Sequence, residues 1–266
     1  MSEKYSVFVC SSDSYSDIWD IFFDMFRRFW PEYDGELYLH TEEKEYRRDD
    51  MNIICTKVGK GKAFGSLLRA GLEKVPSRNI LLIMIDYMMM GPVKVNMLGT
   101  YYQYFRRNNL DALYLVYQKL PMRACEEGMH ISKLLPSEHT FSYQVSFWKK
   151  EMLKEMALPH ENPWTSEWYG NKRALRAELD IRCVNDKTND VFIYNHAGCL
   201  HRGKWLQDAV DFLNEKHYSV DFERRGHYKE EYRSFKVRFL LKMTFILHGL
   251  KGSYWYRIKK SSCDDG

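Results

Sequence analysis

The sequence lacks the features that define several large classes of protein. None of its six cysteines forms a CxxC pair, so neither a zinc ribbon nor a redox motif is indicated. It contains no run of about 18 apolar residues and no apolar signal region at the N-terminus, so we expect neither a spanning helix nor a leader. Its 40 basic and 36 acidic residues leave a net charge of only +4, which argues against a nucleic-acid partner. These absences favour a cytoplasmic protein with reduced thiols.

Two nucleotide-binding signatures are also missing. No GxGxxG motif occurs, which disfavours a dinucleotide fold. The segment GKGKAFG, Gly59 to Gly65, has neither the GK[ST] ending nor the spacing of a Walker loop.

The sequence is rich in apolar and aromatic residues. Hydrophobic residues make up 45% of the 266 positions and aromatic residues 15%, enough for the core of one large α/β domain. Aromatic side chains suit a site that stacks on bases or sugar rings, and they equally suit core packing.

Short apolar runs alternate with helical patterns along the chain. Strands are predicted at 5–10, 36–40, 52–56, 79–85, 112–116, 140–147 and 191–194. Helices are predicted at 17–30, 63–74, 93–108, 149–156, 171–179 and 201–216, with 159–168 irregular. The alternation predicts a mainly parallel, doubly wound sheet, which binds ligands beyond the carboxyl ends of its strands.

No linker interrupts this pattern. We expect residues 1–235 to form one domain and residues 236–266 to form a helical, basic and aromatic C-terminal extension. The extension either docks on the core as an amphipathic helix or makes a peripheral contact with an anionic membrane surface.

Two polar segments follow predicted strands. In the loop at 11–15, Asp13 can reach a ribose or base edge and Tyr15 can stack on a base; a loop that only caps the next helix is the alternative. Asp86 ends the most apolar strand, where a carboxylate can hold a divalent ion on a diphosphate or bind a sugar. Alternatively, Asp86 only caps the following turn.

Two further segments carry reactive side chains. In ENPWTSEW, Trp164 offers a sugar platform beside Glu167 as a general base; otherwise Glu167 is a first-turn helix acid and Trp164 packs. In YNHAGCLHRGKW, histidine, arginine, lysine and glycine converge before a helix, which suits a phosphate. A turn with solvated charges is the alternative there.

Taken in order, these segments resemble a known family. VFVCSSDSYSDIWDIFFDMFRRFWP, ELYLHTE, FGSLLRAGLEKVPSRNILLIMIDYMMMGPV, FSYQVSFWKKEML, ENPWTSEWYGNKRA and HAGCLHRGKW together resemble bacterial GT-A-like glycosyltransferases found with capsular polysaccharide and lipopolysaccharide synthesis genes. The similarity spans roughly residues 5–228. It implies a GT-A-like (Rossmann-like), mainly parallel twisted sheet flanked by helices. It also implies a nucleotide-diphosphate sugar donor, with a UDP-sugar favoured, and a glycan or lipid-linked acceptor at the inner face of the cytoplasmic membrane.

The resemblance and the motifs together define the predicted site. Glu167 is the predicted catalytic base of an inverting transfer. The predicted donor-binding residues are Ser11, Asp13, Tyr15, Asp86, Tyr87, His196, Arg202 and Lys204. The predicted acceptor- or sugar-binding residues are Ser142, Gln144, Trp148 and Trp164.

The acidic motif departs from the family pattern. Relatives tend to carry paired acids where this chain has Ile85 and Asp86. One hypothesis is therefore Mn²⁺ or Mg²⁺ on Asp86 and His196, and the other is metal-independent binding of the diphosphate by His196, Arg202 and Lys204. A catalytically degenerate nucleotide-sugar- or glycan-binding protein on the same fold is the alternative function.

Overall fold

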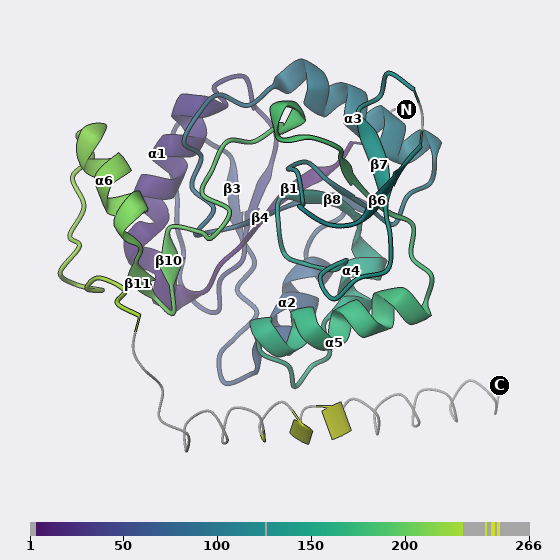
Figure 1. Cartoon of the computed structure of the whole chain (residues 1–266). Helices are drawn as coiled ribbons and strands as arrows, with labels where there is room; N and C mark the ends of the chain where they lie inside the picture. Colours follow the sequence, from purple (N-terminus) through teal and green to yellow (C-terminus); the bar gives the residue numbers. More distant parts are fainter. Residues whose placement is uncertain (1–3, 126, 231–242, 244–245, 248, 251–266) are drawn as a thin grey trace.

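Nine strands form one mixed sheet at the centre of the described chain (Figure 1). The computed structural model describes residues 4–125, 127–230, 243, 246–247 and 249–250. The strand order is β3-β2-β1-β4-β8-β5-β9-β7-β6. The strands are β1 (Ser6–Cys10), β2 (Leu37–Leu39), β3 (Ile53–Cys55), β4 (Asn79–Met84), β5 (Ala112–Tyr114), β6 (Met122–Ala124), β7 (Ile131–Leu134), β8 (Ser146–Lys149) and β9 (Ile181–Val184). Only β7 and β8 run against the others, so the predicted mainly parallel α/β sheet is confirmed.

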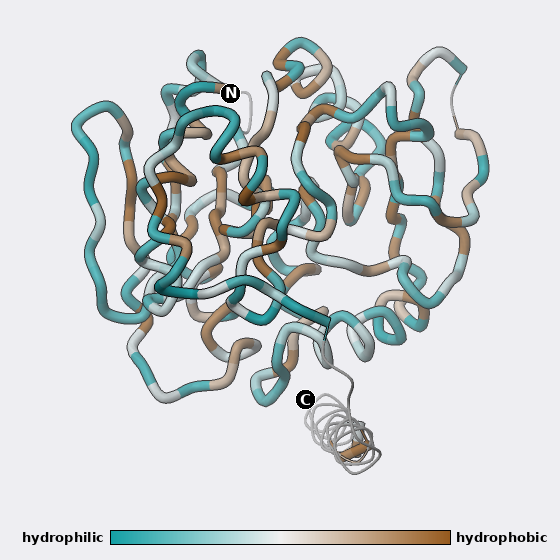
Figure 2. Tube along the Cα trace, turned by 60° about the vertical axis from the view of Figure 1, so that its left-hand side comes forward, coloured by the Kyte–Doolittle hydropathy of each residue, from teal (hydrophilic) through white to brown (hydrophobic). Residues whose placement is uncertain are grey.

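The central strands are buried on both faces. All five residues of β1 are buried, and so are the first five of β4, which pairs with it in parallel. Parallel strands covered by helices on both faces need such continuous apolar runs. Apolar segments accordingly gather inside the molecule, and hydrophilic loops lie at its periphery (Figure 2).

Helices flank the sheet. They are η1 (Asp13–Ile18), α1 (Trp19–Phe29), α2 (Phe64–Glu73), α3 (Val95–Arg107), α4 (Lys150–Met156), α5 (Pro163–Arg176), η2 (Lys187–Asn189) and α6 (Gln207–Glu215). In α1, Trp19, Phe22 and Phe26 recur at helical spacing and are buried. Helices α2, α4 and α5 pack together in the lower part of Figure 1.

Helix α5 begins earlier than the sequence pattern predicts. The segment 159–168 was expected to be irregular, but the helix starts at Pro163. The side chain of Asn162 accepts a hydrogen bond from the backbone N–H of Thr165 at 2.9 Å, and Thr165 Oγ1 accepts one from the N–H of Asn162 at 3.0 Å. This reciprocal cap, with Pro163 in the first turn, begins the helix in a stretch that lacks apolar periodicity.

The predicted strand at 140–147 is mostly a loop, because β8 begins only at Ser146. Three successive backbone N–H groups of this loop donate to side chains instead of to a neighbouring strand. Phe141 donates to Asn171 Oδ1, Ser142 to Tyr114 Oη and Tyr143 to Glu167 Oε1. The extended pattern was recognised, but its hydrogen-bond partners come from α5 and β5.

The predicted helix at 201–216 is wrong in its first part. A two-stranded hairpin of β10 (Leu200–His201) and β11 (Lys204–Trp205) precedes α6. Its turn residues Arg202 and Gly203 both have positive φ, 54° and 77°, as a tight two-residue hairpin requires. The phosphate-binding helix start expected there is therefore a hairpin tip.

Other differences are smaller. No strand forms at 191–194, where Val191 and Ile193 make isolated backbone bonds to Leu115 and Met90. Strands β6, β7 and β9 were not predicted. The expected extension at 236–266 lies almost entirely outside the described residues. No helix of the described chain is long and apolar enough to cross a membrane.

Candidate active site

A cavity of about 400 Å³ opens beyond the carboxyl ends of β1 and β4. These two strands are parallel neighbours, so the loops that follow them meet at one edge of the sheet. The first turns of α2 and α5 and the β10–β11 hairpin complete its wall. The lining residues are Cys10, Ser11, Ser12, Tyr15, His40, Phe64, Leu67, Met84, Ile85, Asp86, Tyr87, Tyr143, Pro163, Trp164, Glu167, Ala197, Leu200, His201 and Arg202.

The loop after β1 lines the cavity with Ser11, Ser12 and Tyr15. Asp13, predicted to contact the donor, is buried beneath this loop. Its carboxylate accepts hydrogen bonds from the backbone N–H groups of Glu42, Glu43 and Lys44 at 2.9–3.1 Å. Burial alone would raise the pKa of Asp13, but these N–H groups hold it below its usual range. Asp13 thus fastens the loop to the segment after β2.

A second contact holds Tyr15 in place. The guanidinium of Arg225 lies 4.7 Å from the centre of the Tyr15 ring. Arg225 donates through Nε to Asp17 Oδ2 at 2.7 Å and through Nη2 to the carbonyl oxygen of Ser14 at 2.8 Å. The segment after α6 therefore clamps the turn that carries Tyr15.

Asp86 follows β4 and faces the cavity. Burial raises its pKa to about 7, and the charge of Glu167 adds to the rise. Among the described residues, none forms an ion pair with this carboxyl group. The loop that closes over it needs a glycine, because Gly198 has φ 81° and a Cβ there would lie 2.7 Å from Asp86 Oδ2. Asp86 is therefore available to a ligand and closely confined.

Glu167 lies on α5 and faces the same cavity as Asp86. Its Oε1 accepts the hydrogen bond from the backbone N–H of Tyr143 at 2.9 Å. Burial raises the pKa of Glu167, against smaller opposing effects of that hydrogen bond and of His139. A carboxylate with raised proton affinity in a cavity is suited to act as a general base. Trp164, one turn earlier on α5, is 56% exposed at the rim.

Gln144 lies behind the lining rather than in it. Its Nε2 donates to Tyr87 Oη at 3.0 Å and to the carbonyl oxygen of His196 at 3.1 Å, and its Oε1 accepts from Tyr194 Oη at 2.6 Å. Tyr87 also stacks on Tyr194 with ring centres 4.8 Å apart. This network fixes the orientation of Tyr87, which does line the cavity.

Some of the remaining predicted residues line the cavity and others lie outside it. Arg202, at the hairpin tip, lines the cavity, whereas Lys204 on β11 is exposed and does not. The imidazole of His196 lies 3.8 Å from Asp190, and burial lowers its pKa. Trp148 is fully buried, and its indole N–H donates to Ser146 Oγ.

Ser142 also lies outside the lining set, and its hydroxyl is buried without a hydrogen-bond partner among the described residues. The structure thus places seven predicted residues around the cavity: Ser11, Tyr15, Asp86, Tyr87, Trp164, Glu167 and Arg202. Their functional roles stay predictions.

His40 lines the cavity and was not predicted. It directly follows β2, and its Nδ1 lies 3.1 Å from Thr56 Oγ1. Burial lowers its pKa to about 4, so the ring is neutral near pH 7. The rule that selected Asp86, a polar side chain at the end of an apolar strand, would also have selected His40.

The described residues contain no group of three or more His, Cys, Asp or Glu side chains placed to hold a metal ion. Mg²⁺ and similar ions are often held by one or two carboxylates together with phosphate oxygens of the ligand. Asp86 fits the role of a single protein ligand in such a site. His196, the second predicted ligand, lies beside Asp190 instead.

Comparisons with known proteins give only distant likeness. No protein-family model and no curated protein sequence matches the chain. An S. aureus TarS structure is similar with 14% identity and a TM-score of 0.45 over 69% of this chain and 58% of that chain. A longer TarS chain is matched over 35% of its length, so this chain spans only part of those proteins.

Two further structures show likeness of the same degree. One is glucosyl-3-phosphoglycerate synthase from Mycobacterium tuberculosis in complex with Mn²⁺ and UDP-glucose, with 15% identity, TM-score 0.44, and 73% and 72% of the two chains covered. The other is 2-C-methyl-D-erythritol 4-phosphate cytidylyltransferase from Thermus thermophilus, with 11% identity, TM-score 0.45, and 81% and 99% covered. Because these values are low, the function is inferred from the cavity itself.

Proposed function

We propose that the chain is a glycosyltransferase that moves a sugar from a nucleotide-diphosphate sugar to an acceptor hydroxyl. The observation that carries the proposal is the pair of cavity carboxyl groups, Asp86 and Glu167, both with raised pKa. They share a cavity at the carboxyl ends of parallel strands, the usual ligand position in such sheets. The resemblance of the ordered sequence segments to GT-A-like glycosyltransferases supports the same function.

The donor occupies the side of the cavity formed by the loop after β1. Tyr15 stacks on the base, and the Ser11 hydroxyl bonds to the nucleoside. Arg202 at the hairpin tip neutralises the diphosphate, for which a guanidinium is well suited. Asp86 binds the sugar hydroxyls or a divalent ion on the diphosphate. Mn²⁺ or Mg²⁺ would supply Lewis-acid stabilisation of the leaving phosphate; without it, Arg202 carries that role.

The acceptor enters past Trp164, whose exposed ring offers a stacking surface for a sugar. Glu167 takes the proton of the acceptor hydroxyl, and at the same time the acceptor oxygen bonds to the anomeric carbon. The bond from that carbon to the diphosphate oxygen breaks, and the nucleoside diphosphate leaves with the electron pair. A single displacement of this kind inverts the anomeric configuration.

Further details follow from the resemblance. The donor is a UDP-sugar, and the acceptor is a glycan or lipid-linked sugar in surface polysaccharide synthesis. The protein then works in the cytoplasm, with a peripheral contact at the inner face of the membrane.

The function is tested by binding and turnover with the Glu167→Gln variant. UDP-, GDP-, CMP- and dTDP-sugars, with and without Mn²⁺, are first screened by thermal shift on the full chain. Glu167→Gln keeps donor binding but loses transfer by about a hundredfold or more, since a positioned base contributes at least that much. The control Glu32→Gln neutralises an exposed carboxylate outside the cavity and keeps full activity. The absence of a thermal shift with every nucleotide sugar would contradict the proposal.

A non-catalytic nucleotide-sugar-binding protein is the second candidate. It is favoured by the single Asp86, where paired acids would be expected for a metal-bound diphosphate. Donor binding without hydrolysis or transfer over a broad acceptor panel would support it.

A further inference from the structure

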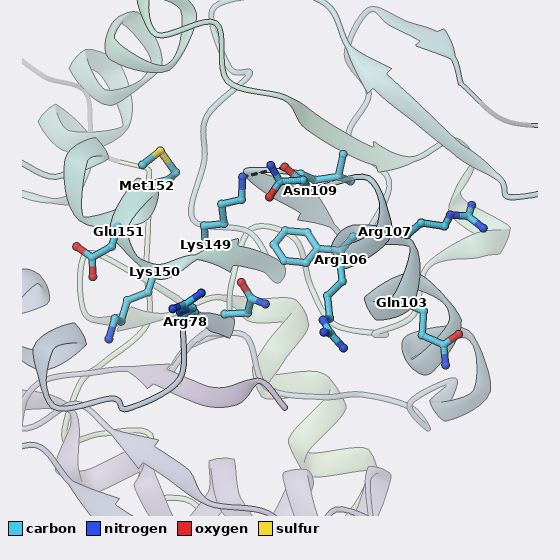
Figure 3. A pocket seen from close by; sticks show the side chains of 12 residues that line it. Arg78, Gln103, Arg106, Arg107, Asn109, Lys149, Lys150, Glu151 and Met152 are labelled. Carbon is cyan, nitrogen blue, oxygen red and sulfur yellow. Dashed lines mark hydrogen bonds between the residues drawn. The ribbon is translucent and has the colours of Figure 1, made fainter. Parts of the chain in front are cut away.

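A second and larger hollow lies away from the candidate active site. Its volume is about 830 Å³, and it lies between the start of β4, the end of α3, the end of β8 and the start of α4 (Figure 3). Five basic residues line it: Arg78, Arg106, Arg107, Lys149 and Lys150. Among the described residues, the only acid in its lining is Glu151. We refer to it as the basic hollow.

The basic hollow and the active-site cavity lie at opposite ends of β4. Asn79, the first residue of β4, lines the basic hollow, whereas Ile85 and Asp86 line the cavity. Six residue steps of an extended strand separate Asn79 from Ile85, about 20 Å at roughly 3.3 Å per residue. A donor in the cavity therefore does not reach the basic hollow, which requires a ligand of its own.

The charge of the lining is far from that of the whole chain. The sequence has 40 basic and 36 acidic residues, whereas the described lining has five basic residues and one acidic residue, and Asp111 beside it pairs with Lys149. Clefts lined by charges of one sign concentrate the field and raise the local concentration of opposite charges. The basic hollow is thus complementary to an anion.

Two of the cations are held at defined positions. Lys149 Nζ donates to the carbonyl oxygen of Asn109 at 2.8 Å and to Asp111 Oδ1 at 2.9 Å. Lys150 Nζ donates to the carbonyl oxygen of Val75 at 2.7 Å, a neutral acceptor that leaves its positive charge in place. Arg78, Arg106 and Arg107 are exposed, and ion pairs at exposed positions are weak enough for a multiply charged ligand to displace.

We propose that the basic hollow binds a ligand carrying two or more phosphate groups. Guanidinium groups bind phosphate oxygens in a bidentate manner, and three arginines and two lysines are among the described residues that line the hollow. Its volume exceeds what one phosphate ion fills and lies in the usual range for organic ligands, about 300–1,000 Å³. Soluble oligophosphates and clustered phospholipid headgroups share this chemistry.

The first experiment titrates sodium tripolyphosphate into the full chain by calorimetry at low and moderate salt. Arg78→Gln/Arg106→Gln is expected to weaken binding by at least tenfold, because two charge-assisted contacts are lost. The matched control Lys119→Gln/Arg123→Gln removes the same charge from exposed sites outside the hollow and is expected to change the affinity less than twofold. Circular dichroism checks that both variants are folded.

A third variant separates the two sites. Arg202→Gln, in the active-site cavity, is expected to weaken UDP binding and to leave tripolyphosphate binding at the basic hollow intact. Equal loss in the hollow variant and its control, or loss only in Arg202→Gln, would overturn the proposal.

The second experiment identifies the source of the phosphate. Vesicles of phosphatidylglycerol and of phosphatidylcholine are sedimented with the wild-type chain and with Arg78→Gln/Arg106→Gln. Binding of phosphatidylglycerol vesicles that the hollow variant loses and the control variant keeps assigns the site to lipid headgroups. Tripolyphosphate binding without such vesicle binding assigns it to a soluble ligand. No binding of either probe refutes the site.

Discussion

At the scale of one residue, Asp86 shows the energetic cost of burying a carboxyl group. Its carboxyl group lies in a confined cavity without an ion pair among the described residues, and burial raises its pKa to about 7. Ionisation of Asp86 near neutral pH is therefore unfavourable unless a ligand supplies a compensating charge or hydrogen bond. Such unfavourable environments are characteristic of binding sites, where the ligand supplies the missing partner.

The first prediction concerns the substitution Asp86→Asn. Removing the confined charge is expected to raise stability by roughly 1–2 kcal/mol at pH 8, discounted for the partial exposure of this side chain. Sugar transfer is expected to fall at least tenfold. Thermal unfolding and donor titration measure the two effects, with the exposed Asp49→Asn as control. A variant that is less stable and equally active would refute this account of Asp86.

A second prediction tests the confinement itself through Gly198→Ala. Positive φ and the approach of a Cβ to Asp86 both penalise alanine here. Gly128→Ala is the matched control, since Gly128 also has positive φ but open space around its Cβ position. The strain of positive φ is expected to cost each variant about 1 kcal/mol of stability, and the contact with Asp86 adds to the loss in Gly198→Ala. Only Gly198→Ala should weaken donor binding. Equal donor affinity of the two variants would show that Asp86 tolerates the contact.

At the scale of the element, the segment after α6 holds the turn after β1 that carries Tyr15. Arg225 pairs with Asp17 and stacks on Tyr15. It also donates to the carbonyl oxygen of Ser14, which lies 211 residues earlier in the sequence. Burial would raise the pKa of Asp17, but the hydrogen bonds and charge of Arg225, with a smaller effect of Arg224, hold it below its usual range. The pair therefore stabilises the state in which Asp17 is ionised.

The third prediction follows from the sign of that shift. The stabilisation is present above the unfolded-state pKa of Asp17 and is lost as pH falls through its lowered folded-state pKa. Arg225→Ala is expected to lower the free energy of unfolding by about 1–3 kcal/mol at pH 7 and to weaken UDP binding. The difference in stability between this variant and the wild type should become smaller below pH 4. Arg224→Ala, an exposed neighbour 3.8 Å from Asp17, should change little. Unfolding curves between pH 3 and 7 test this, and a constant difference would contradict it.

Most elements of the sheet were predictable because their signal is local. The apolar runs of β1 and β4 and the helical spacing of α1 lie within short windows of sequence. The loop at 140–145 and the start of α5 were not, because their hydrogen bonds depend on Asn171, Glu167 and Asn162 in three dimensions. Hairpin β10–β11 was missed because Arg202 adopts positive φ without being glycine.

The same distinction applies to the candidate site. Asp86 and Tyr15 were found because the end of a strand can be recognised in the sequence. Asp13 and Gln144 were assigned to ligands, but the structure shows them bonded to backbone N–H groups and tyrosine side chains of distant segments. Sequence patterns identify polar residues near a site, whereas their partners are decided by tertiary structure.

At the scale of the whole molecule, the described sheet and cavity lie entirely before residue 231. The fourth prediction is that a chain of residues 1–235 folds and binds its donor like the full chain, with a midpoint of unfolding within about 3 °C. It rests on the predicted boundary at residues 235–236, because few contacts cross a boundary between domains. Thermal unfolding and UDP titration of both lengths test this. Loss of folding or of donor binding would show that residues 236–266 belong to the domain.

The position of β8 has a consequence for biosynthesis. This strand, Ser146–Lys149, lies between β4 and β5, which precede it in the chain, and pairs with both. While the ribosome is still adding residues before Ser146, the growing chain has β1, β2, β3 and β4 but an unpaired, strongly apolar edge on β4. Such edges promote association between chains. The nascent protein is therefore exposed to association through the edge of β4 until its central strand emerges.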